Sequence, residues 1–324
     1  MKSFDEIFVD KTKYGVKVQT TEYSEVGEHI IIDQGQSQIA GYTDRQEGLF
    51  EEVPVVIFGD HTRVIKYVDE PFFLGADGVK VLRSKDDNAN YKYLYYALKN
   101  ARIPDTGYNR HFKWLKEVQI NYPDSDKQAE IVDILDNVSS VIKKREDELC
   151  VLDDLIKARF VEMFGDYHTN SKGFESYKGK ELFKFASGKF LPEEKRHEKG
   201  IPVYGGNGIA WYTDCALINY PTIIIGRVGA WCGNIHTATE PIWITDNAIF
   251  IKEQYTNKFT LEFLAEMMNI MDFHQYADFS GQPKITQKPL ETLDYLTPPI
   301  AMQNQFTEFC HQVDKSKVVV ASVK

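Results

Sequence analysis

No group of reactive side chains in this sequence has the spacing that a known catalytic motif requires. The phosphate-binding pattern GxxxxGK followed by Ser or Thr is absent, as are the zinc motif HExxH and the hydrolase motif GxSxG. Gly226, Gly229 and Gly233 follow an apolar run, but their spacing is not the GxGxxG of dinucleotide-binding turns, and a tight turn is the better interpretation. The methyltransferase loop (D/N)PP(Y/F) is also missing, because Thr297–Ile300 reads TPPI. We therefore expect no catalytic residue.

Cysteine spacing and hydropathy indicate neither a metal site nor a membrane. No CxxC pair occurs, which argues against a zinc site and a disulfide framework, so we expect a reducing cytoplasm. No run of about 18 apolar residues exists, and no basic and then apolar leader opens the chain, so neither a membrane span nor a signal peptide is expected. The four scattered cysteines are Cys150, Cys215, Cys232 and Cys310.

Several polar segments offer side chains that recognise nucleic acid. Gln, Asn and Arg can form paired hydrogen bonds with base edges, whereas Lys and Arg hold phosphates. Each segment alone is weak evidence, since surface loops are usually polar, but similar segments recur in both halves of the chain. The candidate DNA-binding residues are Gln36, Gln38, Tyr42, Arg45, Arg63, Arg110, Lys113, Asn207, Tyr212, Arg227, Trp231, Gln282 and Lys284.

These candidates lie in two copies of an internal repeat. Ile39–Asp44 recurs as Ile209–Asp214, and Pro54–Gly59 recurs as Pro221–Gly226. Three further blocks match in the same order, including one in which Arg110 corresponds to Lys284 and one with a Gln five residues after a Pro. Five blocks in register indicate duplication rather than chance.

Each copy begins with a region of short β-branched and aromatic runs bounded by Gly, Asp and Asn, which predicts strands and turns. Tyr91–Leu98 and Leu261–Ile270 carry apolar residues at helical spacing. Both copies are therefore expected to be mixed α+β domains. The predicted strands are Val53–Phe58, Val79–Leu82, Thr222–Ile225 and Ala248–Ile251.

Each copy ends in a long helix with a heptad seam. No Pro or Gly occurs from Ser125 to Phe164, and about 40 residues of helix span roughly 60 Å. A single helix would leave its apolar stripe exposed, so we expect the two seams to pack on each other. The second helix has only about 25 residues before Lys324, so we expect incomplete pairing or a partner over the open end. The predicted seam is Ile131, Leu135, Val138, Ile142, Leu149, Leu152, Ile156, Phe306, Phe309, Val313 and Val320.

The net charge of −10 argues against a strong DNA binder acting alone. The negative charge is concentrated between positions 124 and 166, where twelve Asp and Glu face six Lys and Arg. We expect this segment to face away from DNA, which leaves the recognition regions nearly balanced.

Particular segments resemble the specificity (S) subunit of type I restriction–modification systems. Tyr122–Leu135 has a Pro-containing strand exit, then a Gln, then an Ile- and Val-rich helix; Pro298–Phe306 repeats this order, and Gly281–Ile285 resembles the segment before it. The resemblance covers essentially the whole chain. It implies an α+β fold in which two repeated mixed α/β target-recognition domains are separated by long helices that form an antiparallel coiled coil. We place the domains at 1–123 and 166–298, and the helices at 124–165 and 299–324.

The resemblance also implies a function and partners. Each recognition domain would read one half of a bipartite target in double-stranded DNA, and the coiled coil would fix the distance between the halves. Modification (methyltransferase) subunits that use S-adenosylmethionine, and a restriction/translocase subunit that uses ATP and Mg²⁺, would dock on this chain, which binds no cofactor itself.

Two other functions stay open at this stage. One is a coiled-coil interaction scaffold without a DNA role, which the net acidity would suit; the other is an enzyme with an unrecognised active site. The sequence gives neither the target bases nor which loop residue reads a base and which holds a phosphate.

Overall fold

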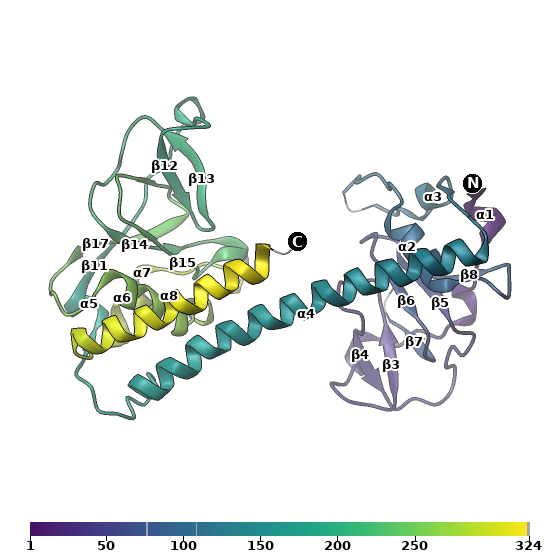
Figure 1. The fold of residues 1–324 in the computed structure, drawn as a ribbon, viewed down its shortest axis with the longest axis horizontal. Helices are drawn as coiled ribbons and strands as arrows, with labels where there is room; N and C mark the ends of the chain where they lie inside the picture. Colours follow the sequence, from purple (N-terminus) through teal and green to yellow (C-terminus); the bar gives the residue numbers. More distant parts are fainter. Residues whose placement is uncertain (76, 108, 323–324) are drawn as a thin grey trace. The chain divides into compact units, whose positions relative to one another are not determined.

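The computed structural model describes residues 1–75, 77–107 and 109–322. Ala76 and Tyr108 of the predicted first domain, and Val323 and Lys324 of the predicted second helix, lie outside the described residues. The chain divides into two compact units, Met1–Lys143 (unit 1) and Lys144–Lys324 (unit 2) (Figure 1). No helix among the described residues is long and apolar enough to cross a membrane.

Unit 1 contains a four-stranded antiparallel sheet in the order β2-β8-β5-β6 and a three-stranded sheet in the order β4-β3-β7, in which β3 and β7 are parallel. A short antiparallel pair, β1 with β9, joins the two ends of the unit. The strands are β1 (Lys2–Ser3), β2 (Phe8–Asp10), β3 (His29–Ile32), β4 (Gly41–Thr43), β5 (Val55–Gly59), β6 (Ile65–Val68), β7 (Phe72–Leu74), β8 (Val79–Ser84) and β9 (Gln119–Ile120). The helices are α1 (Phe4–Ile7), α2 (Tyr91–Lys99), α3 (Phe112–Leu115) and the first part of α4 (Ser125–Phe164), with 3₁₀ turns at Thr12–Tyr14 and Thr20–Glu22.

The alternation of side chains along β5 explains why unit 1 has three layers. Val56 and Phe58 pack in one apolar cluster with α2, whereas Val55 and Ile57 pack in another with the three-stranded sheet. Because successive strand residues point to opposite faces, a strand covered on both sides must be apolar throughout. The continuous apolar run that predicted this strand is therefore the signature of a buried central strand.

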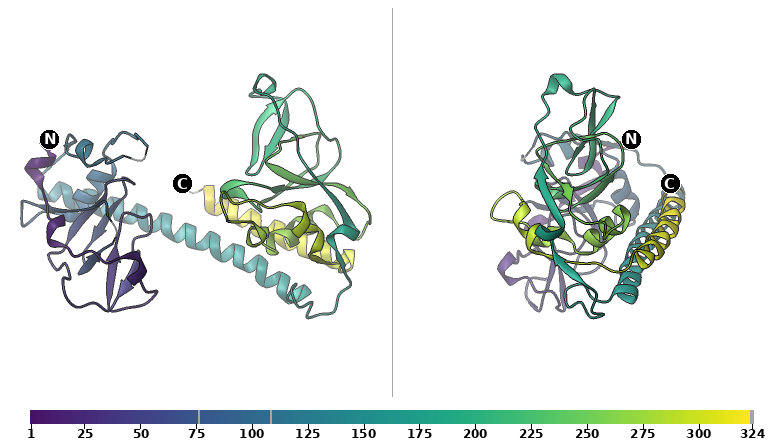
Figure 2. Two further views of the ribbon diagram at one scale, coloured as in Figure 1. Left: turned by 180° about the vertical axis from the view of Figure 1, so that it is seen from behind. Right: turned by 90° about the vertical axis from the view of Figure 1, so that its left-hand side faces the viewer.

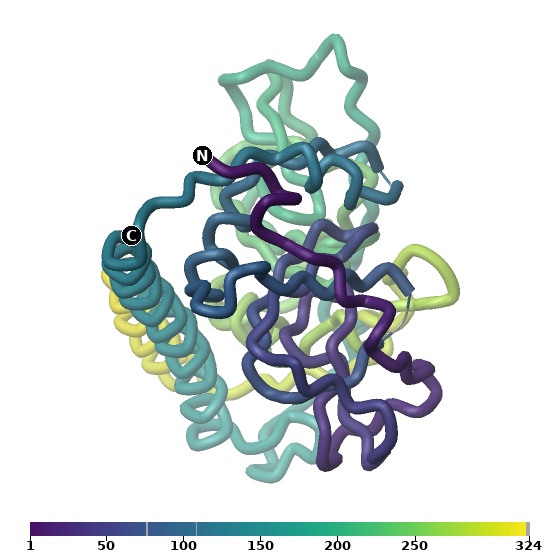
Figure 3. Tube along the Cα trace, turned by 90° about the vertical axis from the view of Figure 1, so that its right-hand side faces the viewer, coloured from purple at the N-terminus to yellow at the C-terminus, as the bar shows by residue number. Residues whose placement is uncertain are grey.

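Unit 2 repeats this arrangement. Its sheets have the orders β11-β17-β14-β15 and β13-β12-β16, and β10 pairs with β18. Ile223 and Ile225 belong to the apolar cluster that includes the helices, and Ile224 belongs to the cluster of the small sheet. Figures 2 and 3 show the course of the backbone from other sides. The strands are β10 (Ser176–Lys178), β11 (Phe183–Ser187), β12 (Ile201–Gly205), β13 (Gly208–Thr213), β14 (Thr222–Gly226), β15 (Ile235–Ala238), β16 (Trp243–Ile244), β17 (Ala248–Gln254) and β18 (Asp294–Leu296). The helices are α5 (Gly179–Leu182), α6 (Leu261–Ile270), α7 (Gln287–Thr292) and α8 (Ile300–Ser322), with 3₁₀ turns at Glu193–Lys195, Gly229–Trp231 and Phe273–Tyr276.

The identical strand orders confirm the predicted duplication and the mixed α+β class. The long helix expected at 124–165 spans Ser125–Phe164. The shorter helices also begin at the predicted residues, because a side chain accepts a hydrogen bond from the first turn of each. Asn90 accepts from the Tyr93 N–H at 3.0 Å before α2, and Thr260 accepts from the Phe263 N–H at 3.3 Å before α6.

Within unit 2, the last part of α4 lies against α8 in the opposite direction, and the two helices run side by side in Figures 1 and 2. Phe160 and Phe164 of α4 both contact the ring of Phe306, with centroids 5.6 and 5.5 Å apart. Further along, Lys317 of α8 forms an ion pair with Asp153 of α4 at 2.8 Å. Residue numbers fall along α4 as they rise along α8, so this pairing is antiparallel.

The residues of the predicted seam are buried or partly buried in unit 2, whereas two of those in unit 1 are exposed. Ile131 packs on the core of unit 1 beside α2, because the first turns of α4 occupy there the place that α8 occupies in unit 2. Asp136 strengthens that packing by accepting hydrogen bonds from Lys92 at 2.6 Å and Tyr96 at 2.7 Å. Leu135 is partly buried, whereas Val138 and Ile142 are exposed. The seam residues that are buried or partly buried in unit 2 are Leu149, Leu152, Ile156, Phe306, Phe309, Val313 and Val320.

Candidate nucleic-acid interface

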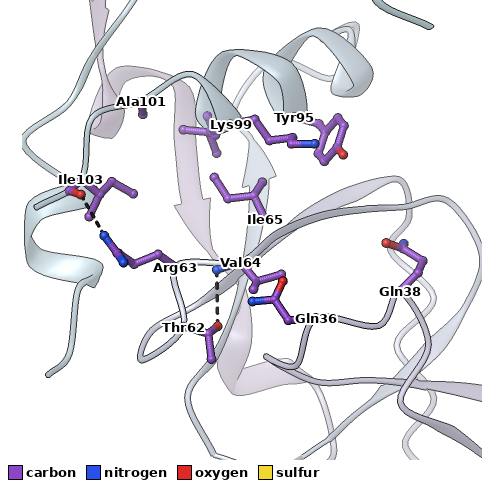
Figure 4. Close-up of a pocket in the computed structure, with 11 residues that line it drawn as sticks. Gln36, Gln38, Thr62, Arg63, Val64, Ile65, Tyr95, Lys99, Ala101 and Ile103 are labelled. Carbon is purple, nitrogen blue, oxygen red and sulfur yellow. Dashed lines mark hydrogen bonds between the residues drawn. The ribbon is translucent and has the colours of Figure 1, made fainter. Parts of the chain in front are cut away.

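Each unit has a polar pocket lined in part by the same two loops, together with α2 and residues 101–103 in unit 1 and with Thr245, Asn247 and Gln282 in unit 2. In unit 1 the pocket lies between the β3–β4 loop and the β5–β6 loop and has a volume of about 520 Å³ (Figure 4). In unit 2 it lies between the corresponding β12–β13 and β14–β15 loops and has a volume of about 460 Å³. We call them the Gln36 pocket and the Trp231 pocket.

The Gln36 pocket collects three of the predicted residues, Gln36, Gln38 and Arg63, and adds Lys99 at the end of α2. The Gln38 amide donates to the Tyr67 carbonyl at 2.7 Å, which fixes that side chain to β6. Lys99 runs beside Tyr95 of α2, with its Nζ 5.3 Å from the ring centroid (Figure 4). The pocket therefore combines amide groups with two cations. Sequence reasoning missed Lys99 because nothing in the pattern of α2 shows that its last turn faces a loop more than 30 residues earlier.

Arg63 occupies an unusual backbone position in the β5–β6 loop. Its φ is +61°, in the left-handed region where a side chain other than Gly or Asn costs roughly 1–2 kcal/mol. The guanidinium donates to Asp105 at 2.6 Å and to the Ile103 carbonyl at 3.4 Å. The backbone N–H of Gly107 and then the charge of Arg63 hold the pKa of the Asp105 carboxyl below its usual range. The guanidinium is therefore held at the rim of the pocket by an ionised partner.

A buried lysine lies beneath the Gln36 pocket. Lys66 of β6 is 2% exposed, and its ammonium donates to the Ser37 carbonyl at 2.6 Å and to Asp33 at 3.4 Å. Burial lowers the pKa of Lys66, and the charge of Asp33 opposes that effect. Since Ser37 lies between Gln36 and Gln38, this buried cation holds the loop that carries both amides.

The Trp231 pocket has a different character. It collects the predicted residues Asn207, Trp231 and Gln282 and adds Trp211 and Asn247. The two Trp side chains are unusually exposed, with exposed fractions of 51% for Trp231 and 38% for Trp211, although large aromatic residues are mostly buried. Among the described residues that line this pocket, none is charged. Its surface therefore offers amides and apolar ring faces rather than cations.

Two features shape the edge of the Trp231 pocket. The Arg196 guanidinium lies 4.1 Å from the ring centroid of Trp211 and orients that ring. Gly229 has a φ of +80°, and a side chain there would begin only 3.3 Å from the Gln282 amide. Glycine therefore suits the positive φ of this turn and leaves room for the Gln282 amide.

His236 of β15 occupies the position that Lys66 occupies in unit 1. Lys66 pairs across the sheet with Ile57 of β5, and His236 pairs with Ile224 of β14, the corresponding strand. Burial lowers the pKa of His236, and a hydrogen bond with the backbone of Gly206 opposes this effect. In both units an ionisable side chain thus supports the loop at the mouth of the pocket.

The other predicted residues lie outside both pockets. Tyr42 and Tyr212 lie on strands β4 and β13 rather than on the loops between strands. Arg45 is exposed and donates to the Glu47 carbonyl at 3.1 Å, and Lys113 lies over the Trp114 ring at 4.1 Å.

Arg110 and Lys284 are exposed and correspond as predicted. The residue after each of them donates its backbone N–H to the residue that directly follows the central strand. His111 donates to the Asp60 carbonyl after β5 at 2.7 Å, and Ile285 donates to the Arg227 carbonyl after β14 at 2.9 Å. The Arg227 side chain lines a separate hollow beside Gln287 and Lys288. Within the described part of the chain, no group of three or more His, Cys, Asp or Glu side chains is placed to hold a metal ion.

Comparison with known families identifies both halves of the chain. The family described as "Type I restriction modification DNA specificity domain" matches residues 10–150 and 171–319. The EcoR124I/EcoR124II specificity subunit of Escherichia coli is 30% identical over 151 residues, which cover 43% of this chain and 37% of that protein. The EcoprrI specificity subunit of E. coli is 28% identical over 186 residues, or 54% of this chain and 45% of that protein. The matches thus span less than half the length of these relatives.

Two solved structures share the fold of this chain. The S subunit of a type I restriction–modification system from M. genitalium aligns with 99% of this chain and 90% of its own, with a TM-score of 0.56 and 20% identity. A second solved structure is described as "Structural basis underlying complex assembly and conformational transition of the type I R-M system". It aligns with 99% of this chain and 92% of its own chain, with a TM-score of 0.50 and 13% identity. These likenesses show the fold. The match of the family to residues 10–150 and 171–319, which covers most of the chain, shows that this chain belongs to the type I restriction–modification DNA specificity family and carries two of its specificity domains.

Proposed function

We propose that this chain reads a bipartite DNA target for a type I restriction–modification complex, with one half-site for each unit. The observation that carries this proposal is that two units of the same strand order each hold a polar pocket lined in part by the same two loops, while the rest of the lining differs between the units. Two copies of one scaffold with different pocket linings suit a protein that must read two different short sequences. Function on such a scaffold resides in the loops, and the sheets hold the loops in place.

The chemistry of the pockets suits recognition without catalysis. Amide side chains pair with adenine edges, Arg and Lys pair with guanine, and apolar groups contact the thymine methyl. We therefore propose that the chain contributes no catalytic residue and that S-adenosylmethionine, ATP and Mg²⁺ are used by other subunits. Those partners would be modification subunits and a restriction/translocase subunit, working with this chain in the cytoplasm.

The net charge supports a role inside a complex. A chain with a net charge of −10 gains little from phosphate contacts, whose favourable energy comes from counterion release by Lys and Arg. If the modification subunits clamp the DNA, they supply those contacts and leave base reading to this chain. We accordingly expect weak DNA binding by the isolated chain and tight, sequence-specific binding by the assembly.

Methylation mapping tests the proposal directly. The chain is expressed with its modification subunits in a bacterial strain that lacks adenine methylation, and methylated positions in the genome are sequenced. We expect one motif with two separated halves. Replacing Trp231 and Gln282 together by Ala should relax bases in one half only, because both line the pocket of unit 2.

The same complex distinguishes the scaffold alternative. A scaffold without a DNA role predicts no sequence-specific gel shift and a methylation pattern that does not change when the pocket residues are replaced. Relaxation of both halves by the Trp231 and Gln282 substitutions would contradict the assignment of one half-site to each unit. Trp243 offers a matched control, since its indole donates to the Lys189 carbonyl at 2.9 Å and it does not line the pocket; Trp243→Phe should leave the motif intact.

A further inference from the structure

In the β5–β6 loop, Arg63 occupies a position whose backbone conformation favours glycine. Arg63 has a φ of +61°, a conformation that Gly and Asn adopt readily and Arg does not. Its N–H donates to the Gly59 carbonyl at 2.8 Å, so the tight turn itself fixes this conformation. A strained residue kept at the rim of a pocket indicates that its side chain has a use that outweighs the strain.

The orientation of the Arg63 guanidinium is fixed before any ligand arrives. Asp105 and the Ile103 carbonyl occupy two of its five N–H donors, which leaves three. Asp105 is itself held by the Gly107 N–H at 3.0 Å. Figure 4 shows the side chain reaching to the Ile103 carbonyl along the wall of the Gln36 pocket. A planar group that is held in this way loses little conformational freedom when it binds.

The loops on the two sides of the pocket are also tied together. Thr62, next to Arg63, donates to the Gln34 carbonyl at 2.6 Å, and the Gln34 side chain accepts from the His61 N–H at 3.1 Å. Gln36 lies two residues further on, and its amide forms no hydrogen bond with another described residue. The hydrogen bonds between the two loops thus fix the Arg63 guanidinium and the Gln36 amide relative to each other. Both side chains keep hydrogen-bonding groups that no described residue uses.

We propose that Arg63, positioned by Asp105, reads a guanine in the first half-site through the O6 and N7 atoms of its major-groove edge. This inference rests on the proposed function of the chain. Arg with two adjacent donors is the commonest specific partner of guanine, because the fork matches that pair of acceptors and no other base presents it. Lys99, whose ammonium lies over the Tyr95 ring on the same pocket, would contact a neighbouring phosphate.

Two competing roles for Arg63 predict different results. A residue that only holds phosphate would weaken binding to all sequences equally, without changing the motif. A residue that only ties the 101–107 segment to the turn would lower stability when removed. The Trp231 pocket, which has no charged lining among the described residues, provides an internal contrast, because a guanine reader of this type cannot be built from its amides and rings.

The decisive variants are Arg63→Gly and Arg63→Asn, because both residues accept the left-handed backbone and so remove the guanidinium while relieving the strain. The complex with its modification subunits is expressed in a strain without adenine methylation, and its motif is sequenced. We expect one guanine of one half-site to lose its preference by about tenfold to a hundredfold, while the other half-site is unchanged. The urea midpoint of the purified chain should stay the same or rise.

Asp105→Asn and Arg83→Gln complete the test. Asp105→Asn should weaken the preference for the same guanine, but less than Arg63→Gly does. Because Asp105 acts through Arg63, the double variant should behave like Arg63→Gly alone. Arg83 is an arginine of the same unit that is bonded to the Glu52 carbonyl at 2.8 Å and lies outside the pocket, so Arg83→Gln should leave the motif intact.

The possible outcomes separate this inference from the proposed function. A wild-type complex with no bipartite motif would overturn the proposed function and this inference with it. A bipartite motif that the two Arg63 variants leave unchanged, that relaxes at a base pair without guanine, or that weakens uniformly would overturn the inference and leave the proposed function standing.

Discussion

The side-chain amide of Gln303 donates a hydrogen bond to the carbonyl of Pro298 at 2.8 Å. Gln128 makes the same bond to Pro123 at 2.8 Å. In both units this tether joins the chain before a long helix to the first turn of that helix. The repeated Gln, five residues after a Pro, is therefore a structural fastening and explains why the spacing is the same in both copies.

Gln303 should contribute more stability than Gln128. It is fully buried, and it also accepts from the Thr260 N–H at 2.9 Å and donates to the Lys258 carbonyl at 2.7 Å. Gln303→Leu should lower the free energy of unfolding by roughly 2–5 kcal/mol, because several buried polar groups lose their partners, whereas Gln128→Leu should cost about 1 kcal/mol. Urea denaturation measures both. Equal losses would contradict this ranking, and Gln312→Ala on exposed α8 surface serves as the control.

Glu266 of α6 should make the stability of unit 2 depend on pH. Burial raises the pKa of this carboxyl above its ordinary value of 4.5, with a further effect from Asp314 and Asp153, while Lys317 and His311 oppose it. Below pH 4.5 both the folded and unfolded chains hold the proton and the stability is full; as pH rises through the raised pKa, the folded chain must carry a buried charge and stability falls.

Glu266→Gln should therefore raise the urea midpoint at neutral pH, and its advantage should shrink as pH falls toward 4.5. Glu262→Gln, on the exposed face of the same helix, is the matched control and should show no such trend. A constant difference between Glu266→Gln and wild type across pH 4.5–8 would mean that the effect does not come from titration of Glu266.

Lys66 should hold both the order of the β3–β4 loop and part of the stability of unit 1. Lys66→Met leaves Asp33 and the Ser37 carbonyl without their buried donor, so the free energy of unfolding should fall by about 1–3 kcal/mol. The Ser37 carbonyl loses its donor, and amide hydrogen exchange at positions 34–40 should accelerate. Lys80→Met, which breaks a pair with Asp10 at 3.7 Å away from this loop, should leave exchange there unchanged.

Features with a periodic or repeated pattern could be predicted from the sequence, and contacts between distant residues could not. The unit 2 part of the α4 seam, from Leu149 to Ile156, and the matching runs at Pro54–Gly59 and Pro221–Gly226 follow directly from burial on fixed helical and strand faces. The equivalence of Lys66 and His236 was missed, because the two side chains differ in chemical type and correspond only in the position that they occupy beneath a loop. Arg63 was a candidate, but its partner Asp105 is 42 positions away and no spacing connects them.

The length of α4 should set the distance between the two half-sites. It runs without a break from Ser125 to Phe164, with its middle exposed around Lys143 and Lys144. Inserting seven residues there keeps the heptad face nearly in phase and lengthens the helix by about 10.5 Å, close to the rise of 3 base pairs. The methylated motif should keep both halves and gain about 3 base pairs between them. A four-residue insertion rotates the face by about 40° and should instead reduce methylation. An unchanged spacer in a stable seven-residue variant would show that the distance is set by the partner subunits and not by this helix.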